Sequence, residues 1–195
     1  SHWAGAATTC MFPQALGCEP TEVDGHPWIK QLITDPAQVR DIEPVDPYTG
    51  WPGDVLNNMI EQLDTRPPTD LIRCPDVQSP LGVAELMWDE SFYLAFYECP
   101  DALHTLLDKI TRYEIGYIRE FNKQIGDRLN PCGFPAVWAD GHGAMIADDT
   151  MSLLSPEMHA EFSAPYADRI ADAGGPIHYH SCTWDEKYFD NSHSI

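Results

Sequence analysis

The order of strand-like and helical segments after residue 70 restricts the fold more than any other feature of this sequence. The strand candidates are residues 71–74, 135–139, 144–147 and 177–180. Between them, residues 100–125 place apolar side chains at the i, i+3, i+4, i+7 spacing of one helical face. Residues 156–173 form a second predicted helix, with Ser155 as its N-cap and a kink at Pro165. Strands that alternate with helices are typical of parallel βα units, so the sequence predicts an α/β fold.

The number of βα units limits the architecture further. Consecutive units of this kind build the (β/α)₈ TIM barrel, which needs about 250 residues when it is complete. This chain has 195 residues, which is room for about four or five units. We therefore expect a single domain over residues 1–195, an incomplete (β/α)₈ TIM barrel that is truncated at both ends.

The first 70 residues differ from the rest because prolines interrupt them repeatedly. In residues 1–70 we expect a Pro-rich irregular region that packs on the barrel and contains only short helices, near 37–41 and 55–63. Trp28, Tyr48 and Trp51 favour an ordered region over a flexible linker, since exposing such aromatic rings to water costs free energy.

The charge balance excludes two classes of partner. With 11 Lys and Arg against 31 Asp and Glu, the formal net charge is −20. A chain this acidic lacks the broad basic surface that binds nucleic acid or an anionic membrane. No apolar stretch is long enough for a transmembrane helix. The GxGxxG, P-loop and GxSxG motifs are absent as well, so nothing indicates a nucleotide-dependent enzyme.

The six cysteines are spread along the chain without a CxxC pair. In a chain long enough to build a hydrophobic core, this distribution favours reduced thiols over a disulfide framework. We therefore expect a cytoplasmic protein in which Cys99 and Cys132 are ordinary thiols, neither metal ligands nor bridged.

Polar side chains follow the predicted strands at the ends where βα folds build their sites. His180 and Cys182 follow the strand at 177–179 and, being two residues apart, point to the same side. Imidazole and thiolate are both zinc ligands, but two ligands do not fill a zinc site. A third must come from outside this chain or from an acidic side chain such as Asp149. The alternative is a buried structural cysteine beside a hydrogen-bonded histidine.

Three further candidates follow other strands. Asp148 and Asp149 come after the strand at 144–147, and one of them is a candidate general base or ligand for a substrate cation. Alternatively, this pair caps local backbone amides. His142 lies between two glycines that would let a ligand approach the backbone, although an exposed turn has the same pattern. Gln78, at a strand end, is a candidate substrate contact or part of a helix-capping loop.

Five segments of the chain occur in an order that one enzyme superfamily shares. They are PQALGC at 13–18, DVQSPL at 76–81, YECP at 97–100 with LLDKIT at 106–111, DD at 148–149 with LSPE at 154–157, and IHYHSC at 177–182. In this ordered set the chain resembles the uroporphyrinogen decarboxylase superfamily, which also contains the cobalamin-dependent methyltransferases. Thr183 stands where the superfamily usually has a glycine. The resemblance implies a (β/α)₈ barrel with its site at the C-terminal face of the strands.

The resemblance implies different chemistry in its two branches. The methyltransferases hold zinc with an HxC pair and a later cysteine, and the zinc activates a thiol that accepts a methyl group from a corrinoid. His180 and Cys182 match the HxC pair, whereas no later cysteine follows before Ile195. The decarboxylases use no metal and bind a porphyrinogen with many carboxylates, which an acidic protein surface repels. Their arginine-bearing N-terminal segment has no counterpart here.

We therefore expect the methyltransferase branch, with zinc at the HxC pair, a corrinoid supplied by a partner protein and a small thiol as acceptor. The assigned residues are Asp148 and Asp149 as catalytic, Gln78 and His142 as substrate-binding, and His180 and Cys182 as metal ligands. One alternative is uroporphyrinogen decarboxylation, a lyase reaction of tetrapyrrole synthesis. The other is a non-catalytic domain that binds a corrinoid partner.

Overall fold

Three short strands that lie parallel and side by side in chain order organise the fold. The computed structural model describes residues 6–131, 143–182 and 188 of the chain. The strands are β4 (Val77–Gln78), β6 (Ala144–Ala147) and β7 (Ile177–His180), in the order β4-β6-β7. A separate parallel pair is formed by β3 (Ile72–Arg73), which comes before β4 in the chain, and β5 (Leu129–Asn130), which comes between β4 and β6. The predicted strands at 71–74, 144–147 and 177–180 are confirmed, and the predicted strand at 135–139 lies outside the described residues.

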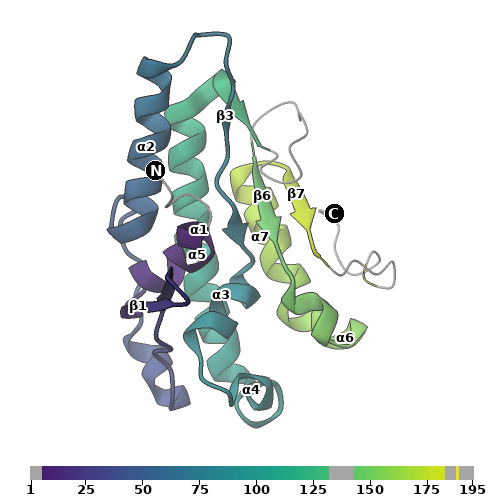
Figure 1. Ribbon diagram of the computed structural model, residues 1–195. Helices are drawn as coiled ribbons and strands as arrows, with labels where there is room; N and C mark the ends of the chain where they lie inside the picture. Colours follow the sequence, from purple (N-terminus) through teal and green to yellow (C-terminus); the bar gives the residue numbers. More distant parts are fainter. Residues whose placement is uncertain (1–5, 132–142, 183–187, 189–195) are drawn as a thin grey trace.

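Helices lie between β4 and β6 and between β6 and β7 in the chain (Figure 1). Between β4 and β6 lie α3 (Pro80–Met87), α4 (Phe92–Glu98), α5 (Pro100–Ile125) and the 3-10 turn η2 (Gly126–Arg128). Between β6 and β7 lie η3 (Thr150–Leu153), α6 (Pro156–Phe162) and α7 (Ala164–Gly174). The described residues therefore form a mixed α/β fold, as predicted, but their strands do not close into a barrel.

The long helix α5 has the bounds and the buried face that its apolar spacing predicts. The predicted core residues are all fully buried: Leu103, Leu106, Leu107, Ile110, Ile118 and Phe121. The helix ends at Gly126, whose φ of 58° lies in the left-handed region that favours glycine. Its C-terminal half packs on α7, where the side chain of Arg119 donates a hydrogen bond to the carbonyl of Ala173 at 2.9 Å.

The segment after β6 forms two helices where one kinked helix was predicted. Ser155 is the N-cap of α6, as expected, and its hydroxyl accepts a hydrogen bond from the amide of Met158. The helix stops at Ser163, and α7 begins again with Pro165 in its first turn. Because proline tolerates the first turn of a helix but disrupts the interior, Pro165 starts a new helix here.

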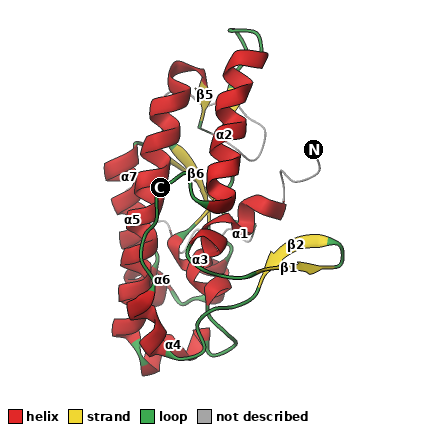
Figure 2. Cartoon of the chain, turned by 90° about the vertical axis from the view of Figure 1, so that its left-hand side faces the viewer, coloured by secondary structure: helices red, strands yellow, loops and turns green. Residues whose placement is uncertain are grey.

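The N-terminal region is more regular than predicted. The short helix η1 (Pro36–Asp41) forms where it was expected, whereas α2 (Gly50–Thr65) is longer than the short helix expected near 55–63. The region also contains α1 (Ala6–Ala15) and the hairpin β1 (Pro20–Val23) with β2 (His26–Ile29). The prediction of an irregular region was therefore wrong. The Asp24-Gly25 turn, with positive φ at both residues, is a strong local hairpin signal that the density of prolines concealed. Figure 2 shows the hairpin extending from the body of the chain.

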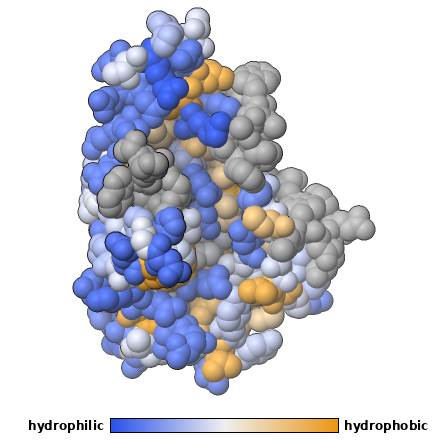
Figure 3. All heavy atoms as spheres, viewed as in Figure 1, coloured by the Kyte–Doolittle hydropathy of each residue, from blue (hydrophilic) through white to orange (hydrophobic). Residues whose placement is uncertain are grey.

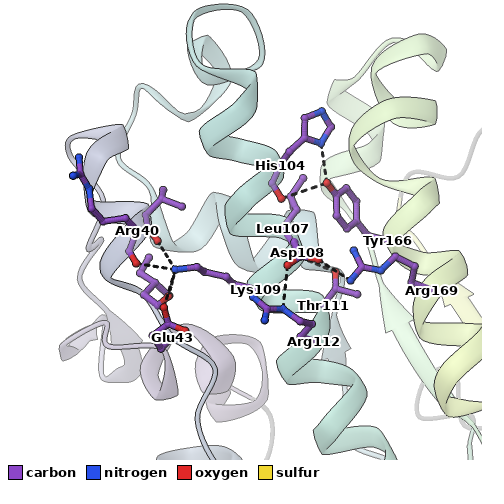
Figure 4. A network of polar contacts seen from close by, with 12 residues as sticks. Arg40, Glu43, His104, Leu107, Asp108, Lys109, Thr111, Arg112, Tyr166 and Arg169 are labelled. Atoms are coloured by element: carbon purple, nitrogen blue, oxygen red, sulfur yellow. Dashed lines mark hydrogen bonds and ion pairs between the residues drawn. The ribbon is translucent and has the colours of Figure 1, made fainter.

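Lys109 joins this N-terminal region to α5 (Figure 4). Its Nζ donates hydrogen bonds to three backbone carbonyl oxygens, those of Val39 (3.1 Å), Arg40 (2.8 Å) and Ile42 (2.5 Å). The ammonium group also forms an ion pair with Glu43 at 3.2 Å. These carbonyls lie at the C-terminal end of η1, where backbone dipoles favour a positive charge.

Two further expectations concern the cysteines and the surface. The five described cysteines, Cys10, Cys18, Cys74, Cys99 and Cys182, are free thiols, and Cys132 lies outside the described residues. No described helix is long and apolar enough to cross a membrane. Hydrophilic side chains cover most of the described surface visible in Figure 3, in keeping with the excess of acidic residues.

Candidate metal-binding site

The alternation of side chains along β6 and β7 separates two faces at the strand ends. Along β6 and the residues after it, Met145, Ala147 and Asp149 point one way. His180 and Cys182 are two residues apart at the end of β7, so their side chains point to one side of the sheet. Ala147 and His180 are register partners in a parallel pair, so this is also the side of Ala147 and Asp149. The predicted metal ligands therefore share a face with Asp149.

Three ligand atoms converge at this point. One atom each from Asp149, His180 and Cys182 lies within 4.8 Å of the other two, and we call these residues the Asp-His-Cys cluster. The Sγ of Cys182 is 3.5 Å from the Nε2 of His180. The backbone amide of Cys182 donates a 2.6 Å hydrogen bond to the Oδ1 of Asp149, which ties the end of β7 to the end of β6. Asp149 thus occupies the place of the third ligand.

The cluster has the donor chemistry of a zinc site. A nitrogen, a thiol sulfur and a carboxylate oxygen are the three atom types that zinc binds in proteins. Three protein ligands also leave one position of a tetrahedral ion open, which distinguishes catalytic from structural zinc sites. The negative charge of Asp149 and its hydrogen bond raise the pKa of the Cys182 thiol. A bound cation would offset that repulsion between carboxylate and thiolate, so these residues fit zinc.

Asp148 points to the opposite side and is fully buried. Its carboxylate accepts hydrogen bonds from the hydroxyls of Ser163, at 2.6 Å, and Tyr179, at 2.5 Å. Its backbone amide donates to the carbonyl of His180 at 2.8 Å. Burial, and then the nearby Asp148 carboxylate, raise the pKa of Tyr179 well above its usual value, so this hydroxyl remains a donor. Asp148 therefore holds the ends of β6 and β7 together from the helix side.

The two predicted substrate contacts have different outcomes. Gln78 ends β4 in the same row as Ala147 and His180, so it lies on the face of the Asp-His-Cys cluster. His142 lies outside the described residues.

Asp76 is a site residue that the sequence analysis missed. Its carboxyl interacts electrostatically with His180 and Asp149, and its Oδ1 is buried without a hydrogen bond to the rest of the described chain. Burial, and to a lesser degree Asp149, raise its pKa, while His180 lowers it. The available signal was its position two residues before Gln78, on the same side of the strand.

Comparison with known proteins identifies a structural neighbour. The chain is similar to a solved methyltransferase from Methanosarcina mazei, with a TM-score of 0.72 and 16% sequence identity. The match covers 93% of this chain and 51% of that chain, so this chain spans about half the length of its neighbour. No protein-family model and no curated protein matches the sequence. At this identity the similarity establishes a common fold, and the chemistry depends on the site itself.

Proposed function

We propose that this chain carries the zinc site of a methyltransferase that transfers a methyl group to a thiol. The observation that carries the proposal is the convergence of Asp149, His180 and Cys182 at the carboxyl ends of two parallel strands. The structural comparison also supports the proposal, because the similar protein from Methanosarcina mazei is a methyltransferase. The chain-order arrangement β4-β6-β7 also supports the proposal that these strands belong to a (β/α)₈ barrel.

The residues of the site would have two roles, metal binding and the positioning of the strand ends. His180 and Cys182 hold the metal from β7, and Asp149 holds it from β6. Bound zinc supplies a Lewis acid that favours the thiolate form of a thiol at neutral pH. Asp148 positions both strand ends through Ser163 and Tyr179 and does not itself contact the substrate. Of the two predicted catalytic aspartates, Asp148 and Asp149, only Asp149 then lies on the face where the reaction takes place.

The source of the methyl group follows from the sequence resemblance. We propose that a partner protein presents it on a corrinoid, and that Gln78 helps to orient the acceptor beside the cluster. Uroporphyrinogen decarboxylation finds no support in the described site. The carboxylates of Asp76 and Asp149 lie near each other there and would repel a substrate that carries many carboxylates itself.

Metal analysis tests this proposal directly. Protein loaded with zinc and dialysed should retain stoichiometric zinc, whereas Cys182→Ser, His180→Ala and Asp149→Asn should each retain much less. Cys99→Ser is the matched control, because Cys99 is a free thiol at the start of α5, outside the cluster. Zinc retention that is equal in all four variants, or absent from the unmodified protein, would refute the zinc site. Methyl transfer from a methylated corrinoid to a thiol then tests the reaction.

A further inference from the structure

Asp76 lies beside the Asp-His-Cys cluster without being one of its three ligands. We propose that Asp76 selects the thiol acceptor: its carboxylate accepts a hydrogen bond from an ammonium or hydroxyl group of the thiol and disfavours anionic thiols. This inference rests on the proposed function and extends it by naming the chemical class of the acceptor.

The strand register places Asp76 on the face of the cluster. Gln78 pairs with Ala147, which in turn pairs with His180, so these three residues form one row across the sheet. Asp76 precedes Gln78 by two residues and therefore points to the same side. Electrostatic interactions of Asp76 with all three members of the cluster agree with that placement.

The carboxyl of Asp76 has an unused acceptor. Its Oδ1 is buried and accepts no hydrogen bond from the residues that the structure describes. A buried acceptor without a donor costs free energy, and a ligand that brings a donor recovers that cost. A thiol that carries an N–H or O–H group near its sulfur would therefore bind better than one without such a group.

The charges of the site add a preference for positive over negative ligands. In the zinc-loaded site, the carboxylate of Asp149 and the thiolate of Cys182 balance the two positive charges of the ion. Asp76 adds a further carboxylate charge to this site, and its Oδ1 accepts no hydrogen bond from the described residues. An ammonium group is attracted to this charge in a partly buried site, and a carboxylate or sulfonate is repelled.

Three small thiols of similar length separate these effects. Cysteamine carries an ammonium group, mercaptoethanol a hydroxyl and mercaptopropionate a carboxylate. Protein loaded with cobalt in place of zinc reports thiol binding through the sulfur-to-cobalt charge-transfer absorption, without any turnover. We expect cysteamine to bind about tenfold or more tightly than mercaptopropionate, the factor that one charge-assisted hydrogen bond provides, with mercaptoethanol between them.

Asp76→Asn tests the assignment of this preference to one residue. The variant should keep its metal and lose most of the difference between cysteamine and mercaptopropionate. Asp54→Asn, at an exposed position on α2, removes the same charge elsewhere and should leave the preference intact.

Several outcomes would overturn the proposal. One is an equal or stronger affinity of the unmodified protein for mercaptopropionate, and another is a preference that Asp76→Asn leaves unchanged. Loss of metal in Asp76→Asn would show that Asp76 is a ligand and not a selector. Failure of the proposed function looks different, because the unmodified protein would then bind no metal, or its cobalt form would show no charge-transfer band with any thiol.

Discussion

Asp148 and Asp149 are neighbours in the sequence with opposite structural roles. The carboxylate of Asp148 is fully buried and accepts hydrogen bonds from Ser163 and Tyr179. The carboxylate of Asp149 is exposed and lies with His180 and Cys182. The two-residue period of an extended chain produces this division, because consecutive side chains point to opposite faces.

Substitution of each aspartate should therefore affect a different property. Asp148→Ala removes the acceptor of three hydrogen bonds, from the hydroxyls of Ser163 and Tyr179 and the amide of Met151, so we expect a loss of about 3 kcal/mol in the free energy of unfolding. Asp149→Ala should change that free energy by about 0.5 kcal/mol or less, since its side chain is exposed, while abolishing zinc retention. Urea denaturation and metal analysis of both variants measure the two effects. Equal loss of stability in the two variants would contradict this division of roles.

The site could be predicted from the sequence only in part. The spacing of His180 and Cys182 was enough to place two ligands on one side of a strand. The alternation of side chains along a strand also places Asp149 on the face of His180 and Cys182. That step requires the register of the sheet, in which Ala147 and His180 are partners, and the sequence does not show this register. The sequence analysis missed Asp76 because the sequence shows neither its buried Oδ1 nor its electrostatic interaction with His180 of β7.

At the scale of elements, α5 was predictable because its pattern is long and regular. Its predicted bounds agree with the structure, and so does its buried apolar face. The same face also buries Glu114, which is fully inaccessible and whose carboxyl oxygens have no hydrogen-bond partner in the described chain. The search for the apolar face counted apolar residues only. The sequence analysis therefore did not predict that Glu114 is buried, although its position on the helix faces the core.

Glu114 should make stability depend on pH. Burial raises the pKa of the Glu114 carboxyl well above its ordinary value. The native state thus binds this proton more tightly than the unfolded state does. Its contribution to stability is complete below the unfolded pKa and is lost as pH rises toward the folded pKa. Glu114→Gln removes this titration, so the variant should gain stability over the unmodified protein as pH rises, by up to about 1.4 kcal/mol per pH unit.

Urea denaturation between about pH 5 and pH 8 measures the stability difference between Glu114→Gln and the unmodified protein. Glu98→Gln, at an exposed position on α4, is the control for the loss of one surface carboxyl, and its stability should stay within about 0.5 kcal/mol of the unmodified protein. A constant difference for Glu114→Gln would mean that this carboxyl titrates alike in the folded and unfolded states.

At the scale of the whole molecule, the sequence predicted the α/β class better than the N-terminal region. Local propensity misjudged α1 because Pro13 lies inside it, and the structure shows that Cys10, Met11 and Phe12 of this helix are fully buried. The ring of Phe12 meets Tyr113 and Tyr117 of α5 edge to face, at centroid distances of 5.5 and 5.2 Å. Contacts so distant in sequence stabilise a helix that its own residues would not predict.

The attachment of the N-terminal region depends on Lys109 as well as on apolar packing. Its ammonium group donates to three carbonyls at the end of η1, and removing it would leave these acceptors without their donor. Lys109→Met keeps much of the side-chain volume and should lower the free energy of unfolding by about 3 kcal/mol. Limited proteolysis should then cut the variant faster between residues 36 and 43, because η1 would open more often.

Lys123→Met provides the control, since Lys123 lies on the same helix and, among the described residues, its exposed ammonium group forms an ion pair with Glu120 alone, at 3.4 Å. Both variants lose one positive charge, so the overall charge effect is the same in each. Exposed ion pairs contribute little to stability, and we expect a change of less than about 1 kcal/mol for Lys123→Met. If the two variants unfold at the same urea concentration and are cut at the same rate, the carbonyl contacts of Lys109 do not hold the N-terminal region. A selective loss in Lys109→Met would show that one buried cation links the region before β3 to the helix that supports the site.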